Sequence, residues 1–494
     1  MTRWTMAGFK TPGVVFAVLL LWAGLAEGQT WTPLANTPSF NANTALLLTD
    51  GTVMVQDTES PNWWLLTPDQ NGSYVNGTWK VMSSMAPNYG PLYHASAVLP
   101  DGRVIIEGGE YNLGTQNWTK LGEIYDPTTD KWTAVTPPAG WSYIGDAQSI
   151  VLANGTFMLA NSQSTQQALL NAKTLTWTST GTGKFDINDE EGWTLLHDGT
   201  VLTVDAYVNR YSASGTHSER YTRSTGAWAS AGSTVVQLWD AAWPCGGSPS
   251  YEVGPAVLRP NGTVFATGAN SCGAGHTAIY NTSSNTWAAG PDIPNGDDIA
   301  DGPAALLPNG TVLIDTSPGI YQSGTRFYIF DGKKFTEVAG PPNSSVDSSY
   351  NGSMLVLPTG QILFTDCSPD VEIFTASRSY KPEWAPTIAT APSTVVRGNS
   401  YQITGTQFNG LSQGAAYGDD AQSSTNYPLV RITNNATGHV FYARTHDHST
   451  MAVATKAKIV ATHFQVSSFM ETGASTLVVV ANGIPSAPVV LTVD

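Results

Sequence analysis

A short apolar run, a turn ending in glycine and a second β-rich run recur seven times along the chain. The copies run from ALLLTDGTVMV and SAVLPDGRVII to LVLPTGQILFT, and successive turn glycines lie 44 to 63 residues apart. Asn-Gly or Asp-Gly between two such runs predicts a β-hairpin. We therefore predict seven copies of one hairpin, with turn glycines Gly51, Gly102, Gly155, Gly199, Gly262, Gly310 and Gly360.

An aromatic signature follows most of these hairpins, in segments such as NGTWKVM, PTTDKWTAV and TSSNTWAAG. A period of about 50 residues with this second signature is typical of kelch-type blades of four strands. The pattern predicts an all-β fold with a seven-bladed kelch-type β-propeller over residues 29–380. Closing the ring removes exposed sheet edges, and TWTPLANTP is the candidate for the strand that completes the last blade.

The period stops after the seventh copy. Residues 381–494 contain alternating segments such as LVRIT, HVFYART and STLVVVANG, separated by Gly, Asn and Pro turns. Such segments predict an immunoglobulin-like β-sandwich, which would form a second domain.

The first 28 residues predict a signal peptide. Arg3 and Lys10 precede the apolar run VVFAVLLLWAGLA, and small residues follow it. That run is too short to anchor the chain, and no later segment is apolar for long enough to cross a membrane. We therefore expect a secreted protein without a transmembrane anchor.

Charge and composition limit the classes of molecule that this protein can bind. Without the signal peptide, the chain has 20 basic and 37 acidic residues, a net charge of about −17. Such a surface repels nucleic acid and anionic membranes. With 16 Trp, 19 Tyr and 48 Gly, the composition favours an extracellular carbohydrate or another cell-surface ligand. Trp63, Trp64 and Trp118 are the candidate contact residues.

The three cysteines cannot all pair within the chain. Cys245 and Cys272 lie in Gly-rich segments, which predicts a disulfide between them in an exported protein. Cys367 would then remain as a buried thiol.

A kelch propeller followed by a small sandwich resembles the galactose oxidase and glyoxal oxidase family of copper radical oxidases. The resemblance implies a copper ion on the propeller axis, bound by a tyrosine cross-linked to a cysteine, by a second tyrosine followed by a histidine, and by a loop histidine of the C-terminal domain. Tyr93 in YHASAVLPDGRV and Tyr350 in YNGSMLVLPTG match the two tyrosines, and His446 or His448 in THDHSTM matches the loop histidine.

Two positions depart from that pattern. The first blade offers Asn41 or Ala42 where the cross-linking cysteine should lie, and Asn351 follows the second tyrosine in place of histidine. The chain thus lacks the thioether and one nitrogen ligand of the kind that copper favours. These departures support the fold and weigh against the oxidase chemistry.

The repeat also aligns one position per blade, nine or ten residues before each turn glycine, where the innermost strand begins. We call these the strand-start residues, and in a propeller they converge around the central channel. Converging carboxylates should bind a cation or hold protons at raised pKa values, and they suit calcium, magnesium or manganese better than copper. Polar residues facing a water-filled channel would give the same pattern. The strand-start residues are Asn41 or Ala42, Tyr93, Asp146, Glu190, Glu252, Asp301, and Tyr350 with Asn351.

Histidine would complete a mixed site if His446 or His448 reached the same channel. Three acidic runs, DINDEE, NGDDIADG and YGDDAQ, lack the spacing of a calcium loop. They are interpreted as exposed acidic turns.

Three functions remain open. The first is a secreted protein that binds carbohydrate or a cell-surface ligand, with a metal site on the axis. The second is a copper-dependent oxidase of carbohydrates, alcohols or aldehydes with an altered site. The third is a non-redox enzyme that uses the axial carboxylates as general acid and base. The catalytic candidates are Tyr93, Tyr350, Glu190 and Asp301.

Overall fold

The computed structural model describes residues 29–207, 215–241, 248–376, 379–420 and 423–494. These residues form an all-β fold. The helices among them are short 3-10 turns: η1 (Pro294–Gly296), η2 (Pro342–Ser345), η3 (Ser349–Asn351) and η4 (Pro382–Trp384).

Seven antiparallel sheets of the described residues share one order, in which the strands follow one another outward from an innermost strand. The first four sheets are β2 (Ala42–Leu47), β3 (Val53–Asp57), β4 (Trp63–Thr67) and β5 (Thr78–Val81); β7 (Ala95–Val98), β8 (Val104–Glu107), β11 (Gly122–Asp126) and β12 (Lys131–Ala134); β13 (Ser149–Val151), β14 (Phe157–Ala160), β15 (Gln167–Asn171) and β16 (Thr176–Thr180); and β17 (Thr194–Leu195), β18 (Val201–Val204), β19 (His217–Thr222) and β20 (Ala227–Ser233). The remaining three are β21 (Val253–Leu258), β22 (Thr263–Gly268), β23 (Thr277–Asn281) and β24 (Thr286–Ala289); β25 (Ala304–Leu306), β26 (Val312–Thr316), β27 (Arg326–Phe330) and β28 (Phe335–Val338); and β29 (Ser353–Val356), β30 (Ile362–Thr365), β31 (Val371–Thr375) and β1 (Thr30–Pro33). A small separate sheet consists of β6 (Pro91–Leu92), β9 (Tyr111–Asn112) and β10 (Thr115–Gln116). In the sequence, β6 precedes β7 of the second sheet, and β9 and β10 lie between β8 and β11.

The predicted hairpins join the first two strands of each sheet. All seven turn glycines have φ between 77° and 85°, a backbone conformation that residues with a Cβ rarely adopt. This explains why glycine recurs at this place in every repeat.

The sheets close into a β-propeller. Innermost strands contact one another from β2 through β7 to β13 and from β17 through β21 and β25 to β29, and β29 of the last sheet contacts β2 of the first. The last sheet is completed by β1, whose Trp31 lies opposite Phe374 of β31. The predicted role of TWTPLANTP is therefore confirmed, and a strand from the start of the described chain closes the ring.

The aromatic signature joins neighbouring sheets at their outer edges. A tryptophan indole on the outermost strand donates a hydrogen bond to a backbone carbonyl at the end of the preceding sheet. This occurs from Trp79 to Asn36 (2.9 Å), from Trp132 to Ser83 (2.8 Å) and from Trp177 to Thr136 (2.8 Å).

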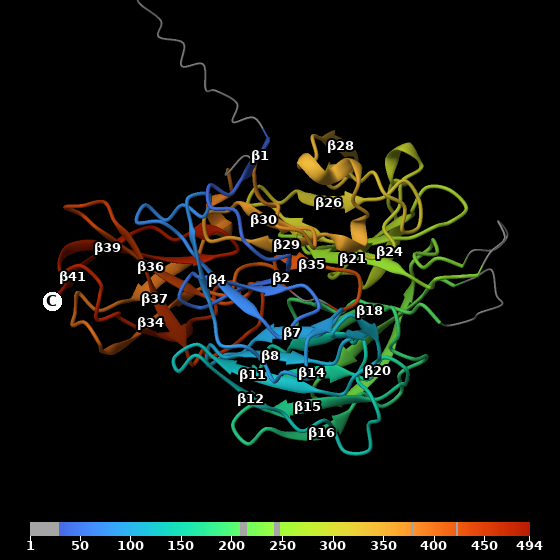
Figure 1. Ribbon diagram of the computed structural model, residues 1–494, viewed down its shortest axis with the longest axis horizontal. Coiled ribbons are helices and arrows are strands. Elements are labelled where there is room, and N and C mark those ends of the chain that lie inside the picture. The colour runs from blue at the N-terminus through green and yellow to red at the C-terminus, as the bar shows by residue number, and fades with distance from the viewer. Residues whose placement is uncertain (1–28, 208–214, 242–247, 377–378, 421–422) are drawn as a thin grey trace, which may run out of the picture.

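The C-terminal strands form one curved sheet with its own core. Its order is β32 (Thr387–Thr390), β34 (Ser400–Thr406), β38 (Val460–Gln465), β37 (Val440–His446), β36 (Leu429–Asn434), β39 (Gly473–Ala481), β41 (Val489–Val493) and β33 (Thr394–Val395), with β40 (Ile484–Pro485) paired to β39. A separate apolar cluster, from Val395 to Val493, fills this sheet. Figure 1 shows most of these strands, in orange to red, at one side of the propeller.

One C-terminal strand lies apart from the others. β35 (Ala415–Ala416) pairs with β25 and contacts β21 and β29, so it lies among the innermost strands (Figure 1). The segment around it is fixed by long-range hydrogen bonds, in which the amide of Leu195 donates to Gln413 Oε1 (2.7 Å) and the Ser423 hydroxyl donates to the Ala45 carbonyl (3.1 Å). We call residues 411–420 and 423–427 the axial loop, because these residues enter the channel of the propeller.

In the part of the chain that the structure describes, no helix has the length and apolar character needed to cross a membrane. The predicted signal peptide, residues 1–28, lies outside the described residues. The same holds for Cys245, so the disulfide between Cys245 and Cys272 stays a prediction.

Candidate functional site

A cavity of about 610 Å³ lies where the strand-start residues converge. Every predicted position from the second to the seventh sheet contributes to its wall. The lining residues are Thr58, Glu59, Leu92, Tyr93, Glu110, Tyr111, Asp146, Glu190, Glu252, Asp301, Tyr321, Tyr350, Asn351, Cys367 and Asp419.

Backbone conformation directs several of these side chains. Tyr93, Glu190 and Asp301 have φ of 50°, 59° and 55°, although none is glycine. A left-handed conformation costs about 1–2 kcal/mol for a residue with a Cβ. Such strain persists only where the surrounding structure imposes it, and it concentrates at functional sites. Three of the strand-start residues are thus held in a conformation that their own preferences oppose.

The axial carboxylates form two groups of three. In one, single oxygens of Asp146, Asp189 and Glu190 lie within 4.8 Å of one another. In the other, the same holds for Glu190, Glu252 and Asp301. We call these residues the axial carboxylates, and Glu190 belongs to both groups.

Three of these carboxylates have a buried oxygen without a hydrogen-bond partner. Asp146 Oδ1, Glu252 Oε2 and Asp301 Oδ1 are buried and have no hydrogen-bond partner. None of the cavity's described lining residues is Lys, Arg or His. An unpaired buried charge is costly, so these groups must either hold protons or bind a cation.

The pKa values follow from this environment. Burial raises the pKa of Asp146, Glu190 and Asp301 well above its usual range. Repulsion adds to the effect, chiefly from Asp189 on Asp146 and from Glu252 on the other two. Without a bound cation, these groups retain protons at pH values where exposed carboxylates have lost them.

Tyrosines surround the carboxylates. The Tyr321 hydroxyl donates a hydrogen bond to Glu252 Oε1, and Tyr321 is 44% exposed, so its ring faces the opening. The ring of Tyr350 meets that of Tyr321 edge-on at 5.7 Å. Tyr93 lies beneath Tyr417 of the axial loop with 6.4 Å between ring centroids, and the Tyr417 hydroxyl donates to the Tyr350 carbonyl (2.7 Å). Carboxylates, tyrosine hydroxyls and tyrosine rings therefore lie together at one cavity.

The axial loop approaches the carboxylates closely at Gly418. A Cβ added to Gly418 would lie 2.1 Å from Asp301 Oδ1. A Cβ added to Gly192 would lie 2.4 Å from the carbonyl oxygen of Gly418. Only glycine at both positions allows the loop to reach this depth.

We expect Gly418→Ala to destabilise the protein by about 1–3 kcal/mol, the usual cost of an overpacked core. Denaturant unfolding with circular dichroism would measure it. Gly296→Ala is the control, because a Cβ at Gly296 meets open space and only the backbone cost of its positive φ remains. Equal losses for both variants would contradict the close approach.

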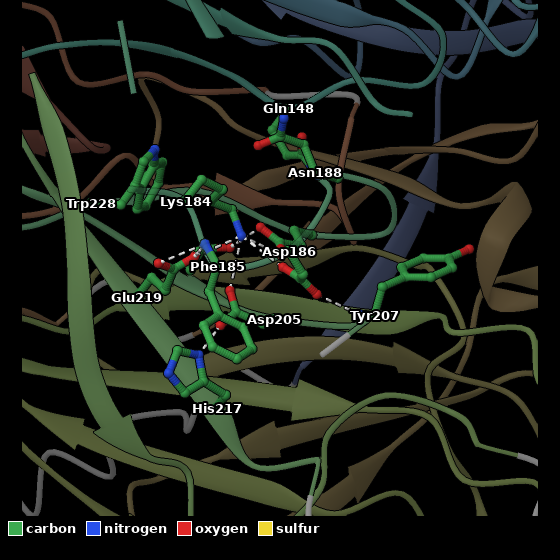
Figure 2. A network of polar contacts seen from close by, with 12 residues as sticks. Gln148, Lys184, Phe185, Asp186, Asn188, Asp205, Tyr207, His217, Glu219 and Trp228 are labelled. Atoms are coloured by element: carbon green, nitrogen blue, oxygen red, sulfur yellow. Dashed lines mark hydrogen bonds and ion pairs between the residues drawn. The ribbon is translucent and has the colours of Figure 1, made fainter. Parts of the chain in front are cut away.

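A second acidic cluster has a basic residue that balances its charge. Asp186, Asp205 and Glu219 also bring oxygens within 4.8 Å of one another. The buried ammonium of Lys184 lies among them at 2.9, 3.0 and 2.8 Å (Figure 2). The Glu191 carboxylate lies 2.8 Å from the same ammonium. This cluster therefore carries its own cation, whereas none of the described residues that line the axial cavity is Lys, Arg or His.

The structure does not bring the predicted histidines to the axis. His446 Nδ1 and Nε2 contact Asp447 Oδ2 (2.8 Å) and Ser400 Oγ (3.0 Å) at the end of β37. His448 is buried against Thr462 Oγ1 (2.8 Å). Its amide donates to the Pro100 carbonyl beside a hairpin turn. The C-terminal segment that enters the channel is the axial loop, so the expected mixture of imidazole and carboxylate is not found.

Three further expectations need correction. Trp63 is fully buried and Trp64 stacks on Phe40 at 4.7 Å, whereas Trp118 is 40% exposed. Thus only Trp118 of the three is available as an exposed aromatic face. Neither Asn41 nor Ala42 lines the cavity. The acidic runs are not exposed turns, because they contain the buried carboxylates of Asp189, Glu191, Asp297, Asp298, Asp419 and Asp420.

Some residues of the cavity wall, or in contact with it, were missed by the sequence analysis. Cys367, expected as a buried thiol, is only partly buried and lines the cavity, and burial raises the pKa of its thiol to about 12. Asp189 precedes a strand-start residue and could have been found from that position. Asp419 and Tyr417 lie outside the repeat, so the repeat carried no signal for them.

Comparisons with known proteins agree with the fold. Residues 91–139 match the family model described as Kelch motif. The chain is 29% identical over 91 residues to Kelch-like protein terF of Aspergillus terreus, and that match covers 18% of this chain and 19% of the relative. It thus spans about a fifth of the curated relative.

Solved structures are similar over a larger part of the chain. A fungal alcohol oxidase of the AA5 family, solved in complex with copper, has a TM-score of 0.51 and 13% identity, with 94% of this chain and 99% of that chain covered. Virginiamycin B lyase from Staphylococcus aureus has a TM-score of 0.47 and 10% identity, with 71% and 99% covered.

The copper of that alcohol oxidase does not suit the donors found here. The described cavity wall offers carboxylate, phenol and amide oxygens and a thiol held protonated by its raised pKa, but no imidazole. Copper prefers nitrogen and thiolate ligands, whereas carboxylates suit calcium, magnesium and manganese. The kelch motif, the sheet order and the similarity over nearly the whole chain nevertheless agree, and this protein has a galactose oxidase-like kelch propeller fold.

Proposed function

We propose that this is a secreted seven-bladed kelch propeller with an immunoglobulin-like C-terminal domain, which binds a hard divalent cation and an extracellular carbohydrate in its axial cavity. The seven sheets of common order and the separate C-terminal core support the architecture. The predicted signal peptide supports secretion.

The observation that carries the cation site is the set of buried oxygens without a hydrogen-bond partner on Asp146, Glu252 and Asp301. Glu252 is only 7% exposed, lines the cavity and leaves Oε2 without a partner. The Lys184 cluster shows that this chain can place an ammonium among buried carboxylates. None of the described residues that line the axial cavity is Lys, Arg or His, which favours a cation from solution.

The cavity also favours a sugar. Carbohydrates bind through hydroxyl contacts to carboxylates and metal ions and through ring contacts to aromatic faces. The exposed ring of Tyr321 and the ring of Tyr111 lie on the wall beside the carboxylates. A cation held by few protein oxygens would leave coordination positions for neighbouring hydroxyls of a sugar.

We expect the purified protein to retain calcium or manganese in stoichiometric amounts after dialysis, measured by plasma mass spectrometry. Isothermal titration of the chelated protein should show higher affinity at higher pH, because the raised pKa values of Asp146, Glu190 and Asp301 make protons compete with the cation. Stoichiometric copper lost in Tyr93→Phe would instead support the oxidase, and the absence of any bound metal would overturn the cation site.

We expect Tyr321→Ala to lower the affinity for a glycan selected on an array by about tenfold, the loss of roughly 1.4 kcal/mol that an aromatic face contributes. Trp118→Ala is the matched control, because Trp118 is similarly exposed but does not line the cavity. Tyr321→Phe separates the ring from the hydroxyl that contacts Glu252. An effect of Trp118→Ala as large as that of Tyr321→Ala would place the sugar elsewhere.

A further inference from the structure

We propose that the ligand of the axial cavity is a neutral sugar whose two adjacent hydroxyls bind one Ca²⁺, held by Glu190, Glu252 and Asp301, while the sugar ring lies against Tyr321. This inference deepens the proposed function, since it rests on a cation and a carbohydrate in the same cavity. It adds the protein ligands of the ion and the chemical class of the sugar.

The three carboxylates come from consecutive sheets. Glu190, Glu252 and Asp301 precede the innermost strands β17, β21 and β25. One oxygen of each lies within 4.8 Å of the other two. Two oxygens bound to one Ca²⁺ at about 2.3–2.6 Å can lie up to about 5 Å apart. The group thus matches one Ca²⁺ with little movement, whereas Mg²⁺, which binds oxygen at about 2.1 Å, would require the group to contract.

Glu252 supplies an observation that is independent of this spacing. The residue is only 7% exposed and lines the cavity. Its Oε2 is buried without a hydrogen-bond partner, whereas Oε1 accepts the hydroxyl of Tyr321. Asp301 Oδ1 is also buried without a partner. Buried polar atoms are normally satisfied, and one cation between Glu252 and Asp301 would satisfy both oxygens.

The hydrogen bond from Tyr321 to Glu252 fixes an aromatic ring beside the ion site. Tyr321 lies between β26 and β27 in a left-handed backbone conformation, with φ of 57°, and is 44% exposed. Its ring also meets that of Tyr350 edge-on. Ligand sites combine aromatic surface with a few placed polar groups that fix the orientation of the ligand. A sugar that lies on this ring therefore brings its hydroxyls to the ion.

The ion would keep positions for the ligand. Each of the three carboxylates offers one oxygen to the group, and Ca²⁺ takes six to eight oxygen ligands. Hydroxyl oxygens are hard donors of the kind that Ca²⁺ binds. Two adjacent hydroxyls occupy neighbouring positions on the ion and form a chelate, which a single hydroxyl does not. The ligand class is therefore a sugar with two adjacent free hydroxyls.

Charge restricts this class further. When all three are ionised, Glu190, Glu252 and Asp301 carry one negative charge more than one Ca²⁺ balances. The cavity wall adds Glu59 and Glu110, and none of its described residues is Lys, Arg or His. A carboxylate or sulfate on the sugar would be repelled by this wall. Neutral sugars are therefore favoured over uronates and sulfated sugars.

The first test is calorimetric titration of sugars into the full chain, with calcium and with chelator. The neutral probes are the methyl glycosides of mannose, galactose and glucose, and methyl galacturonoside is the charged counterpart of the galactoside. We expect at least one neutral glycoside to bind at least about tenfold more tightly with calcium. Its deoxy forms that lack either adjacent hydroxyl should bind at least about tenfold more weakly, the loss of one contact to a charged group. The galacturonoside should bind more weakly than the galactoside.

The second test measures calcium. The sugar must raise the affinity for calcium by the same factor by which calcium raises the affinity for the sugar. Glu252→Gln should lower calcium affinity by at least about a hundredfold, the upper end of what loss of an outer-shell partner costs, and should lose the calcium-dependent sugar binding. Asp292→Asn is the control and should change neither, because its carboxylate is exposed, contacts His276 and does not line the cavity. Circular dichroism would show that both variants fold, and the titrations of the unaltered protein decide alone if Glu252→Gln does not.

The outcomes separate this inference from the proposed function. Equal sugar affinity with calcium and with chelator would overturn the inference and leave the cation and the carbohydrate of the proposed function in place. Undiminished binding of the deoxy forms, or of the galacturonoside, would overturn the ligand class in the same way. Retained calcium without binding of any of these sugars would overturn the inference and leave the cation site. Absence of calcium binding would overturn both.

Discussion

Replacement of Lys184 by methionine is expected to destabilise the protein by about 3–5 kcal/mol, the usual cost of removing one partner from a buried ion pair. Burial alone would lower the pKa of Lys184, but Glu191, Asp205 and neighbouring carboxylates raise it well above its usual range. Methionine preserves much of the side-chain volume, so the loss would report the missing charge. Urea unfolding at pH 7 would measure the difference.

The matched control for that experiment is Lys173→Met, at an exposed position of the third sheet's last turn. A surface substitution of this kind should change stability by less than about 0.5 kcal/mol. A loss below about 1 kcal/mol in Lys184→Met would show that the surrounding carboxylates hold enough protons to dispense with the ammonium.

The second large effect is a cation-dependent change in the pH profile of stability. The pKa values of Asp146, Glu190, Asp301 and Asp419 are raised in the folded protein, first by burial. A raised pKa means that the folded state binds more protons than the unfolded chain. Stability is then fully present below the ordinary carboxyl pKa near 4 and is lost as the pH rises through the folded values.

In the chelated protein, unfolding free energy should therefore fall as the pH rises from about 5 to 8. Calcium at a hundred times its dissociation constant should restore about 2.7 kcal/mol at the upper end and much less near pH 4.5, where protons compete. Thermal and urea unfolding with and without chelator would measure both profiles.

Buried carboxyls away from the cavity serve as an internal reference. Burial raises the pKa of Glu372 to about 9 and that of Asp298 to about 7. Glu372 and Asp298 contribute to the same fall in unfolding free energy with rising pH. Added calcium should not restore the part of the fall that comes from these two residues. Identical profiles with and without calcium would mean that the axial carboxylates bind no cation.

The repeat predicted much of the axial site, because one strand-start position per sheet must face the channel. Glu190 and Asp301 were found in this way without any knowledge of side-chain contacts. The same logic could not locate Asp419, which comes from the C-terminal axial loop outside the repeat. Nor could it locate Lys184, which is not a strand-start residue and has distant partners in Asp205 and Glu219.

Local sequence patterns gave wrong predictions of exposure and position where burial depends on the whole fold. Runs of acidic residues usually lie in solvent, yet Asp189 and Asp297 are buried. Asp297 accepts a hydrogen bond from the Tyr328 hydroxyl (2.8 Å), which comes from a strand many residues later. Similarly, histidines that matched a family position lie by the hairpin turns, because a different segment of the C-terminal region reaches the axis.

The strand that completes the last sheet also sets an order of events in folding. β1 is synthesised before any other strand described here, but its partner β31 ends at Thr375, so β1 must wait while most of the propeller is made. Contacts that join distant segments form slowly, and unpaired strand edges favour aggregation in the meantime. Closure thus acts as a completion check: a chain truncated within the propeller would retain unpaired edges and remain a substrate for chaperones and proteases.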